Sequence, residues 1–258
     1  MYPILFTVYN ISFHVFGIFL GLAFFFGFFF AKKIARHKKL NPEFFSKNFI
    51  LFVLVFLFFG RLFYLLCNLD LYTDNLKASF SISDGGFSFL AAWSFSTLFL
   101  YLLCRIFRQN FWTWFDVFFI AFLSSMFFVE IGRFFSGSTF GNETSLPWGM
   151  IFESATLGFI VPLHPVQIYS AILLLVIFLV FYPQIKMGLR EGTFSALGIS
   201  ILGFALFMNS FFRGDENTIF FFLNLSHILS LAFFIFGLGR LFSISNKRKK
   251  IIERREQK

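Results

Sequence analysis

The stretch FHVFGIFLGLAFFFGFFFA, residues 13–31, contains no charged side chain and is followed at once by KKIARHKK, residues 32–39. As a helix, a segment of this length spans roughly 30 Å, which is the thickness of the hydrocarbon core of a bilayer. A basic run directly after an apolar stretch is typical of the cytoplasmic end of a transmembrane helix. This stretch therefore predicts a membrane-spanning helix.

The composition extends this prediction to the whole chain. Of the 258 residues, 58% are apolar, 14% are charged and 50 are Phe. The mean hydropathy is +0.78. Soluble proteins carry about 25% charged residues, and a soluble domain with so few could not cover its surface. The same numbers exclude intrinsic disorder, so the chain is predicted to be an integral membrane protein.

Seven apolar segments are long enough to cross a bilayer as helices, whose backbone groups are satisfied internally. They are residues 13–31, 49–67, 87–104, 111–129, 166–183, 194–212 and 218–242. We therefore predict an all-α integral membrane protein with seven transmembrane helices. One membrane domain, residues 1–245, includes an outer loop at 130–165, and a basic tail follows at 246–258.

The basic residues lie after alternate segments. Of the 22 Lys and Arg, 17 fall in four groups: six at 32–47, two at 105–108, two at 186–190 and seven at 247–258. Because Lys and Arg favour the cytoplasmic side, these groups predict an N-terminus outside and a C-terminus in the cytoplasm. Membrane orientation accounts for the net charge of +9, so no nucleic acid is expected as a partner.

The longest connection outside the predicted spans runs from Glu130 to His164, and its Gly and Pro content indicates structured turns. Loops of this length are commonly functional. Arg133, at the end of the fourth span, has two interpretations that the residue types leave open. It pairs with Glu130 three residues earlier, or it binds a lipid phosphate together with backbone N–H groups of the Gly-rich turn.

Other polar residues in or beside the spans are weaker candidates. Arg61 is either a functional charge inside the second span or a side chain that reaches the outer face. His164 can act as a base, although a bond to the backbone is the simpler interpretation. Asp116 is expected at the inner interface, and His227 is expected to pack between helices. No metal-ligand spacing or dinucleotide fingerprint is present, so no metal and no cofactor is predicted.

Six short motifs lie along the chain: GRLFY at 60–64, DGGFSF at 84–89, EIGRFFSGSTFG at 130–141, LPWGM at 146–150, LHPVQIY at 163–169 and FFRGDE at 211–216. In this order and spacing they resemble the motifs of bacterial prolipoprotein diacylglyceryl transferase, and most closely those of its divergent branch. The resemblance covers nearly the whole chain. Its most specific parts are HPxQxY and the glycine spacing of the loop that precedes it.

The resemblance implies a multi-pass enzyme of the bacterial cytoplasmic (inner) membrane that acts in lipoprotein biosynthesis. Such an enzyme moves diacylglyceryl from phosphatidylglycerol to the lipobox cysteine in the signal segment of a preprolipoprotein, and glycerol 1-phosphate is released. His164 and Glu130 are the candidate catalytic residues, since the thiol must lose a proton. The candidate lipid-binding residues are Arg133 and, by motif position, Arg61, Gly132, Gly137, Gly141, Gln167, Tyr169 and Arg213.

The chain departs from the family at positions that usually carry function. Leu90 stands where a His or Tyr is expected, and Glu130 and Leu206 stand where arginines are expected. Further replacements are Ser138 and Thr139 for a cysteine pair and Ser210 for an acid. Two functions therefore stay open. The chain is an active transferase, or it is a non-catalytic relative that binds phosphatidylglycerol or lipoprotein signal segments, or serves as a membrane subunit.

Overall fold

The computed structural model describes residues 4–8, 11–67, 69, 87–137, 139–152, 161–185, 191–214, 218–220 and 223–256. In this part of the chain the helices are α1 (Val15–His37), α2 (Pro42–Cys67), α3 (Phe89–Ile106), α4 (Phe111–Ser136), α5 (Val166–Gln184), α6 (Thr193–Ser210) and α7 (Leu225–Glu256). Two short antiparallel hairpins accompany them, formed by β1 (Ile4–Val8) with β2 (Ile11–His14) and by β3 (Thr218–Phe220) with β4 (Leu223–Asn224). The predicted all-α fold class is confirmed.

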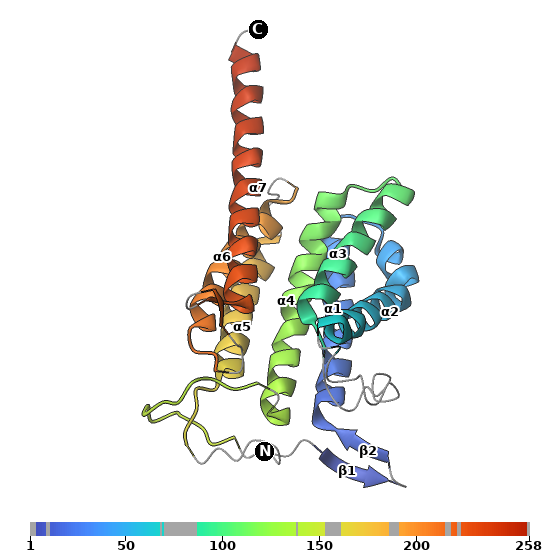
Figure 1. Ribbon diagram of the computed structural model, residues 1–258. Helices are drawn as coiled ribbons and strands as arrows, with labels where there is room; N and C mark the ends of the chain where they lie inside the picture. The colour runs from blue at the N-terminus through green and yellow to red at the C-terminus, as the bar shows by residue number, and fades with distance from the viewer. Residues whose placement is uncertain are drawn as a thin grey trace.

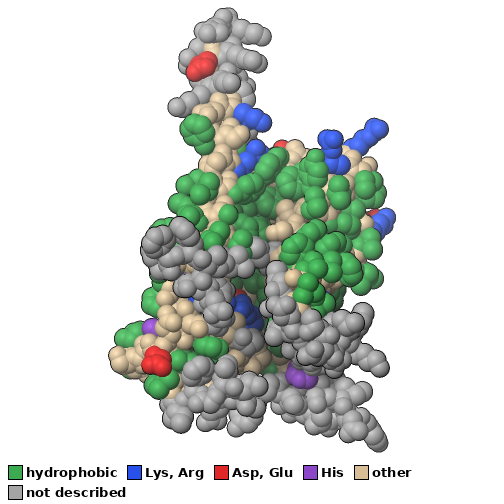
Figure 2. All heavy atoms as spheres, viewed as in Figure 1, with side chains coloured by type: hydrophobic (Ala, Val, Ile, Leu, Met, Phe, Trp, Pro, Cys, Tyr) green, Lys and Arg blue, Asp and Glu red, His purple; other side chains and the backbone are tan. Residues whose placement is uncertain are grey.

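The helices have the length and composition that a membrane requires. Among the described residues, α1, α2, α4, α5, α6 and α7 contain apolar stretches long enough to span a bilayer, and α3 is a shorter apolar helix. Large apolar side chains cover the outside, and Phe25, Phe58 and Phe242 are each more than 60% exposed. Such a surface is unfavourable in water and favourable in lipid. Figure 2 shows this apolar cover, with Lys and Arg gathered toward the end where α7 emerges.

Helix α4 lies at the centre and separates two packed groups of helices (Figure 1). On one side α1 packs along α4 and α2 pairs with α3, whereas on the other side α5 packs against α4 and α6 pairs with α7. Helix α4 is the most buried of the spanning helices in the described part of the chain, and its Trp114, Phe119 and Leu123 are at most 1% exposed. Both groups of helices pack against α4, and this packing positions the last turns of the helix.

Helix α4 is longer than the sequence predicted. The side chain of Asn110 accepts hydrogen bonds from the N–H groups of Trp112 and Thr113 and caps its start. The helix ends at Gly137, whose left-handed backbone (φ 66°) favours glycine. Residues 130–136, predicted to begin the outer loop, are therefore the last two turns of α4. The Gly content of the segment predicts turns, but Gly132 lies in a packed helix.

Helix α7 begins later than predicted and ends later. Residues 218–220 and 223–224 form the β3–β4 hairpin, so the span predicted from residue 218 begins as strands. Asn224 then caps the helix, because its side-chain oxygen accepts the N–H of His227 at 3.1 Å. From Leu225 the helix continues to Glu256 without a break and extends well beyond the bundle (Figure 1).

Asp116 joins three helices at the end of the bundle where α1 ends. Its carboxylate is fully buried and accepts Nζ of Lys38 at 3.0 Å, the backbone N–H groups of Gly192 and Ser195 at 2.9 Å, and Oγ of Ser195 at 2.8 Å. Gly192 is the residue at the start of α6 and supplies no side chain, so a carboxylate from α4 performs the capping. The structure thus gives Asp116, expected at the inner interface, a buried structural role at this end of the bundle.

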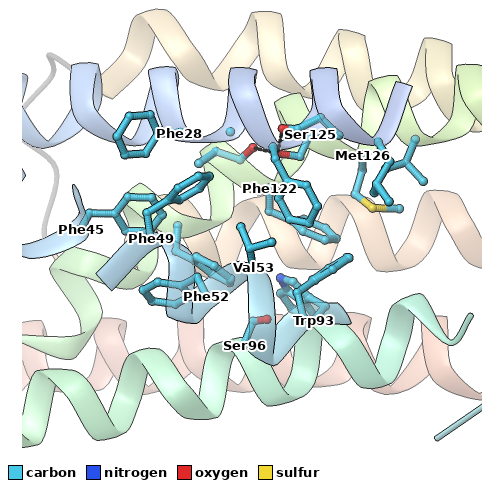
Figure 3. Close-up of a pocket in the computed structure, with 18 residues that line it drawn as sticks. Phe28, Phe45, Phe49, Phe52, Val53, Trp93, Ser96, Phe122, Ser125 and Met126 are labelled. Carbon is cyan, nitrogen blue, oxygen red and sulfur yellow. Dashed lines mark hydrogen bonds between the residues drawn. The ribbon is translucent and has the colours of Figure 1, made fainter. Parts of the chain in front are cut away.

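Aromatic rings line a cavity between α1, α2, α3 and α4 (Figure 3). Rings of Phe28, Phe49, Phe52, Phe122 and Trp93 are among its lining residues. The lining is almost entirely apolar, with hydroxyl groups only from two serines. Val129, which directly precedes Glu130 in α4, also lines the cavity. The cavity therefore extends to the last turns of α4.

Candidate functional site

Glu130 and Arg133 form an ion pair in the last turns of α4. Nη1 of Arg133 donates to Oε1 of Glu130 at 3.0 Å, and the two side chains are 19% and 8% exposed. The guanidinium also lies 5.6 Å from the centre of the Phe89 ring at the start of α3. Of the two interpretations of Arg133, the structure shows the ion pair. The other N–H groups of the guanidinium make no hydrogen bond to a described residue, so the pair leaves donors for a second partner.

Two predicted glycines shape this helix end. A Cβ atom on Gly132 would lie 2.7 Å from Cβ of Phe19, so the glycine lets α4 pack closely against α1. Gly137 closes the helix, and its N–H points back to the carbonyl groups of Arg133 and Phe134. Gly132 and Gly137 therefore fix the backbone of the helix end that carries Arg133.

The start of α3 brings two other motifs to the same end of the bundle. The N–H of Ser88 donates to the carbonyl of Gly60 at 2.9 Å, and the next residue, Phe89, contacts Arg133. Arg61 follows Gly60 in α2, is partly exposed, and lies 5.8 Å from the ring of Tyr64 one turn later. Residues from GRLFY, DGGFSF and EIGRFF thus meet around the first turn of α3.

A second cluster forms where three loops pair through their backbones. The N–H of Gly141 donates to the carbonyl of His164 at 3.0 Å, and the N–H of His164 donates to the carbonyl of Asn142 at 3.0 Å. On the other side, the N–H of Asn142 donates to the carbonyl of Phe212 at 2.8 Å, and Gly141 pairs with Arg213. A Cβ atom on Gly141 would lie 2.5 Å from Cβ of His164 and 2.7 Å from the carbonyl oxygen of Phe212. Only glycine fits at this junction.

The junction brings together three polar side chains. Nδ1 of His164 lies 3.0 Å from the hydroxyl oxygen of Tyr169, and Nε1 of Trp148 donates to that oxygen at 2.9 Å. The Phe212 ring packs against both, at 5.1 Å from the centre of the His164 ring and 5.9 Å from that of Tyr169. His164 and Tyr169 were predicted as site residues, whereas Trp148 was not among the predicted site residues.

Residues 3–243 match the prolipoprotein diacylglyceryl transferase family. The chain belongs to this family. Its sequence identity to individual members is low, but the alignments extend over most of the chain. The phosphatidylglycerol–prolipoprotein diacylglyceryl transferase of Wolbachia pipientis subsp. Culex pipiens is 27% identical over 248 residues, which cover 92% of each chain. The protein of the same name from Clostridium tetani is 25% identical over 253 residues, covering 97% of this chain and all of its own length.

A shorter match reaches higher identity. The phosphatidylglycerol–prolipoprotein diacylglyceryl transferase of Chlamydia caviae is 34% identical over 133 residues, but this alignment spans 48% of the present chain and 45% of the relative. The family match covers all of the described helices except the end of α7.

Within the family motifs, Gln167 and Arg213 connect elements of the second cluster. Gln167 is 1% exposed, and its side-chain amide donates to the carbonyl of Thr139, so it ties the glycine loop to α5. Nη1 of Arg213 donates to Oγ of Ser226 at 3.0 Å and joins the end of α6 to the start of α7. The acidic residues that follow it in the chain, Asp215 and Glu216, lie outside the described residues.

The departures from the family motifs are accommodated without a replacement charge on α6. Leu206 packs against the apolar core, and its carbonyl accepts Oγ of Ser210 at 2.8 Å. Ser138 lies outside the described residues, as does the side chain of Leu90. The arginine expected at Leu206 and the acid expected at Ser210 are therefore replaced by a local contact within one helix.

The site therefore consists of two groups: the helix-end cluster of Glu130, Arg133 and Phe89, and the loop cluster of Gly141, Trp148, His164, Tyr169 and Phe212. The chain from residue 137 to 141 connects them. Among the described residues, no hydrogen bond or ion pair joins the His164 ring to Glu130 or Arg133. This part of the chain also contains no group of three His, Cys, Asp or Glu that could bind a metal ion.

Proposed function

We propose that the chain is a phosphatidylglycerol–prolipoprotein diacylglyceryl transferase of the bacterial inner membrane. The observation that carries this proposal is the backbone junction at Gly141, where the glycine loop, LHPVQIY and FFRG meet. These are the motifs by which the sequence resembles the family, and a glycine is sterically required where they meet. Membership of the family over residues 3–243 supports the same activity.

The reaction sets two chemical requirements. A sulfur–carbon bond forms between the lipobox cysteine and the diacylglyceryl methylene group, while the carbon–oxygen bond to phosphate breaks and its electron pair stays on oxygen. The thiolate is the nucleophile, so the thiol proton must be accepted by another group. Glycerol 1-phosphate leaves with an additional negative charge that nearby donors must stabilise.

Arg133 is the residue proposed to bind the lipid phosphate. Its bond to Glu130 uses one nitrogen, and a guanidinium can bind a phosphate through two parallel N–H groups of its planar fork. The apolar cavity adjoining this end of α4 offers an environment suited to an acyl chain of the same lipid. Arg133 thereby supplies a cationic contact for phosphatidylglycerol, and the cavity supplies an apolar one.

Glu130 and His164 are the proposed catalytic residues. Glu130 binds Arg133 through Oε1, and its second oxygen makes no hydrogen bond to a described residue. His164 is partly exposed and lies at the junction of the family motifs. The last turns of α4, which carry Glu130, and the start of α5, which follows His164, lie toward the end of the bundle opposite the C-terminus of α7 (Figure 1). This placement agrees with a reaction at the outer face if the basic tail is cytoplasmic.

A second candidate function is binding of phosphatidylglycerol or of a lipoprotein signal segment without catalysis. The apolar Leu206 on α6 favours it, because no charge of α6 replaces the expected arginine. Both functions use Arg133 to bind the phosphate. They differ in whether Glu130 and His164 then take part in a reaction.

The experiment that separates the two functions uses the purified chain in phosphatidylglycerol vesicles with a lipobox peptide. Transfer of labelled diacylglyceryl to the peptide is expected, and Glu130→Gln and His164→Ala should each abolish it while the helical circular dichroism is retained. Phosphatidylglycerol binding without transfer by the unaltered protein would instead establish the binding function.

Arg133 variants test the phosphate site in either case. A charge-assisted hydrogen bond contributes about 1.5–3 kcal/mol, and about 1.4 kcal/mol is a factor of ten, so Arg133→Ala should weaken phosphatidylglycerol binding roughly tenfold or more. Arg133→Lys should weaken it less, since it keeps the charge and loses the fork. The matched control is Arg105→Ala, an exposed arginine at the other end of the bundle. Equal affinity of the Arg133→Ala and unaltered proteins excludes the phosphate site.

A further inference from the structure

The loop cluster contains a chain of hydrogen bonds whose direction can be assigned. The indole N–H of Trp148 lies 2.9 Å from the hydroxyl oxygen of Tyr169, which in turn lies 3.0 Å from Nδ1 of His164. An indole nitrogen can only donate, so the Tyr169 oxygen accepts from Trp148. A phenol has one hydrogen of its own to donate, and either ring nitrogen of a neutral imidazole can accept it.

The remaining contacts decide where the hydroxyl hydrogen goes. Among the described residues, Nδ1 of His164 is the only acceptor within hydrogen-bond distance of the Tyr169 hydroxyl. If Nδ1 donated instead, the oxygen would receive two donors and its hydrogen would have no acceptor in this part of the chain. The better-satisfied arrangement runs from Trp148 to Tyr169 to Nδ1, and it leaves the imidazole proton on Nε2.

The position of the His164 ring is restrained on several sides. Both backbone polar groups of His164 are bonded to the 141–142 segment. Gly141 lies directly against its Cβ atom, and Phe212 packs against the ring at 5.1 Å. Nε2 makes no hydrogen bond to a described residue, and the side chain is partly exposed. The ring is therefore oriented through Nδ1, while Nε2 stays available to a ligand.

We propose that Tyr169 and Trp148 are positioning residues that hold His164 as the Nε2–H tautomer, so that it donates a hydrogen bond to an anionic phosphate oxygen of the substrate. This inference rests on the transferase function proposed above and assigns a role within it. As the carbon–oxygen bond breaks, the phosphate gains a negative charge, and the Nε2–H group stabilises that charge. Nε2 already carries a proton and cannot accept the one from the thiol. That proton passes to Glu130, which becomes the base.

The tautomer can be measured without any turnover. The chain contains only four histidines, so protein labelled with ¹⁵N at the imidazole rings and held in detergent micelles yields few signals, and His164→Gln assigns the relevant pair. Spectra are taken at about pH 8.5, some two units above the ordinary imidazole pKa of about 6.5. The expected result is a protonated-type signal for Nε2 and an unprotonated-type signal for Nδ1.

Three variants distinguish positioning from packing. Tyr169→Phe keeps the ring and removes the donor to Nδ1, so His164 should change to a mixture of tautomers. Trp148→Phe removes the indole N–H, which lets the Tyr169 oxygen accept from His164, and a smaller change in the same direction is expected. Tyr182→Phe is the control, because this tyrosine lies on the same helix and its hydroxyl bonds no described residue.

The outcomes are decisive whether or not the protein is an active transferase. An Nδ1–H tautomer in the unaltered protein overturns the inference, as does an unchanged His164 spectrum in Tyr169→Phe. If Tyr169→Phe does not fold, the unaltered protein and Trp148→Phe still decide between the tautomers. In the transfer assay Tyr169→Phe should lower kcat at least tenfold with little change in KM. Absence of transfer by the unaltered protein, with the Nε2–H tautomer present, refutes the proposed function and keeps the positioning role.

Discussion

Replacement of Asp116 by Ala should destabilise the bundle more than any change of an exposed charge. The carboxylate is fully buried and accepts four hydrogen bonds, from Nζ of Lys38, the N–H groups of Gly192 and Ser195, and Oγ of Ser195. Its removal leaves an ammonium that is only 12% exposed and two backbone donors without their acceptor. Loss of one partner of a buried ion pair costs about 3–5 kcal/mol, so we expect the free energy of unfolding to fall by about 4 kcal/mol.

Equilibrium unfolding in mixed detergent micelles, followed by helical circular dichroism, measures this change. The control is Glu43→Ala. This residue pairs with Lys47 at the same 3.0 Å, but the two side chains are 66% and 76% exposed. An exposed pair at this helical spacing contributes about 0.3–0.5 kcal/mol. Adding Lys38→Met to Asp116→Ala should recover part of the loss, because it removes the unpaired buried charge. A loss below about 1 kcal/mol for Asp116→Ala, or one equal to that of Glu43→Ala, would refute the reasoning.

Two further predictions concern the loop junction and the orientation. Gly141→Ala should abolish transferase activity, because the added carbon would overlap His164 and the Phe212 carbonyl; Gly17→Ala, which meets nothing within 4 Å, should leave activity intact and stabilise α1 by about 0.5–1 kcal/mol. If both alanine variants behave alike in the transfer assay, the junction is not what limits activity. Cysteines introduced at Ser145 and Ser245, both exposed, should be labelled from opposite sides of the membrane by an impermeant maleimide, and labelling from one side contradicts the predicted orientation.

The sequence was sufficient where local properties determine the structure. Seven apolar segments of bilayer length correspond to the seven helices of the described chain, because hydrocarbon length and backbone satisfaction depend only on consecutive residues. The motif resemblance likewise led to the family that residues 3–243 match. Predictions from the local sequence were wrong at the end of α4 and at the start of α7. The glycine at 132 indicated a turn, yet close packing on α1 keeps it helical, and the apolar run from 218 forms strands before Asn224 starts α7.

Only the tertiary structure decided what the polar side chains do. The sequence allowed Arg133 to bind either Glu130 or a phosphate, and folding places it against Glu130 and Phe89. Neither Asp116 as the cap of α6 nor Trp148 as the donor to Tyr169 could be predicted, since their partners lie 76 and 21 residues away in the chain. The physical reason is that a hydrogen bond requires atoms within about 3 Å, and such distances between remote residues are set by how whole helices pack.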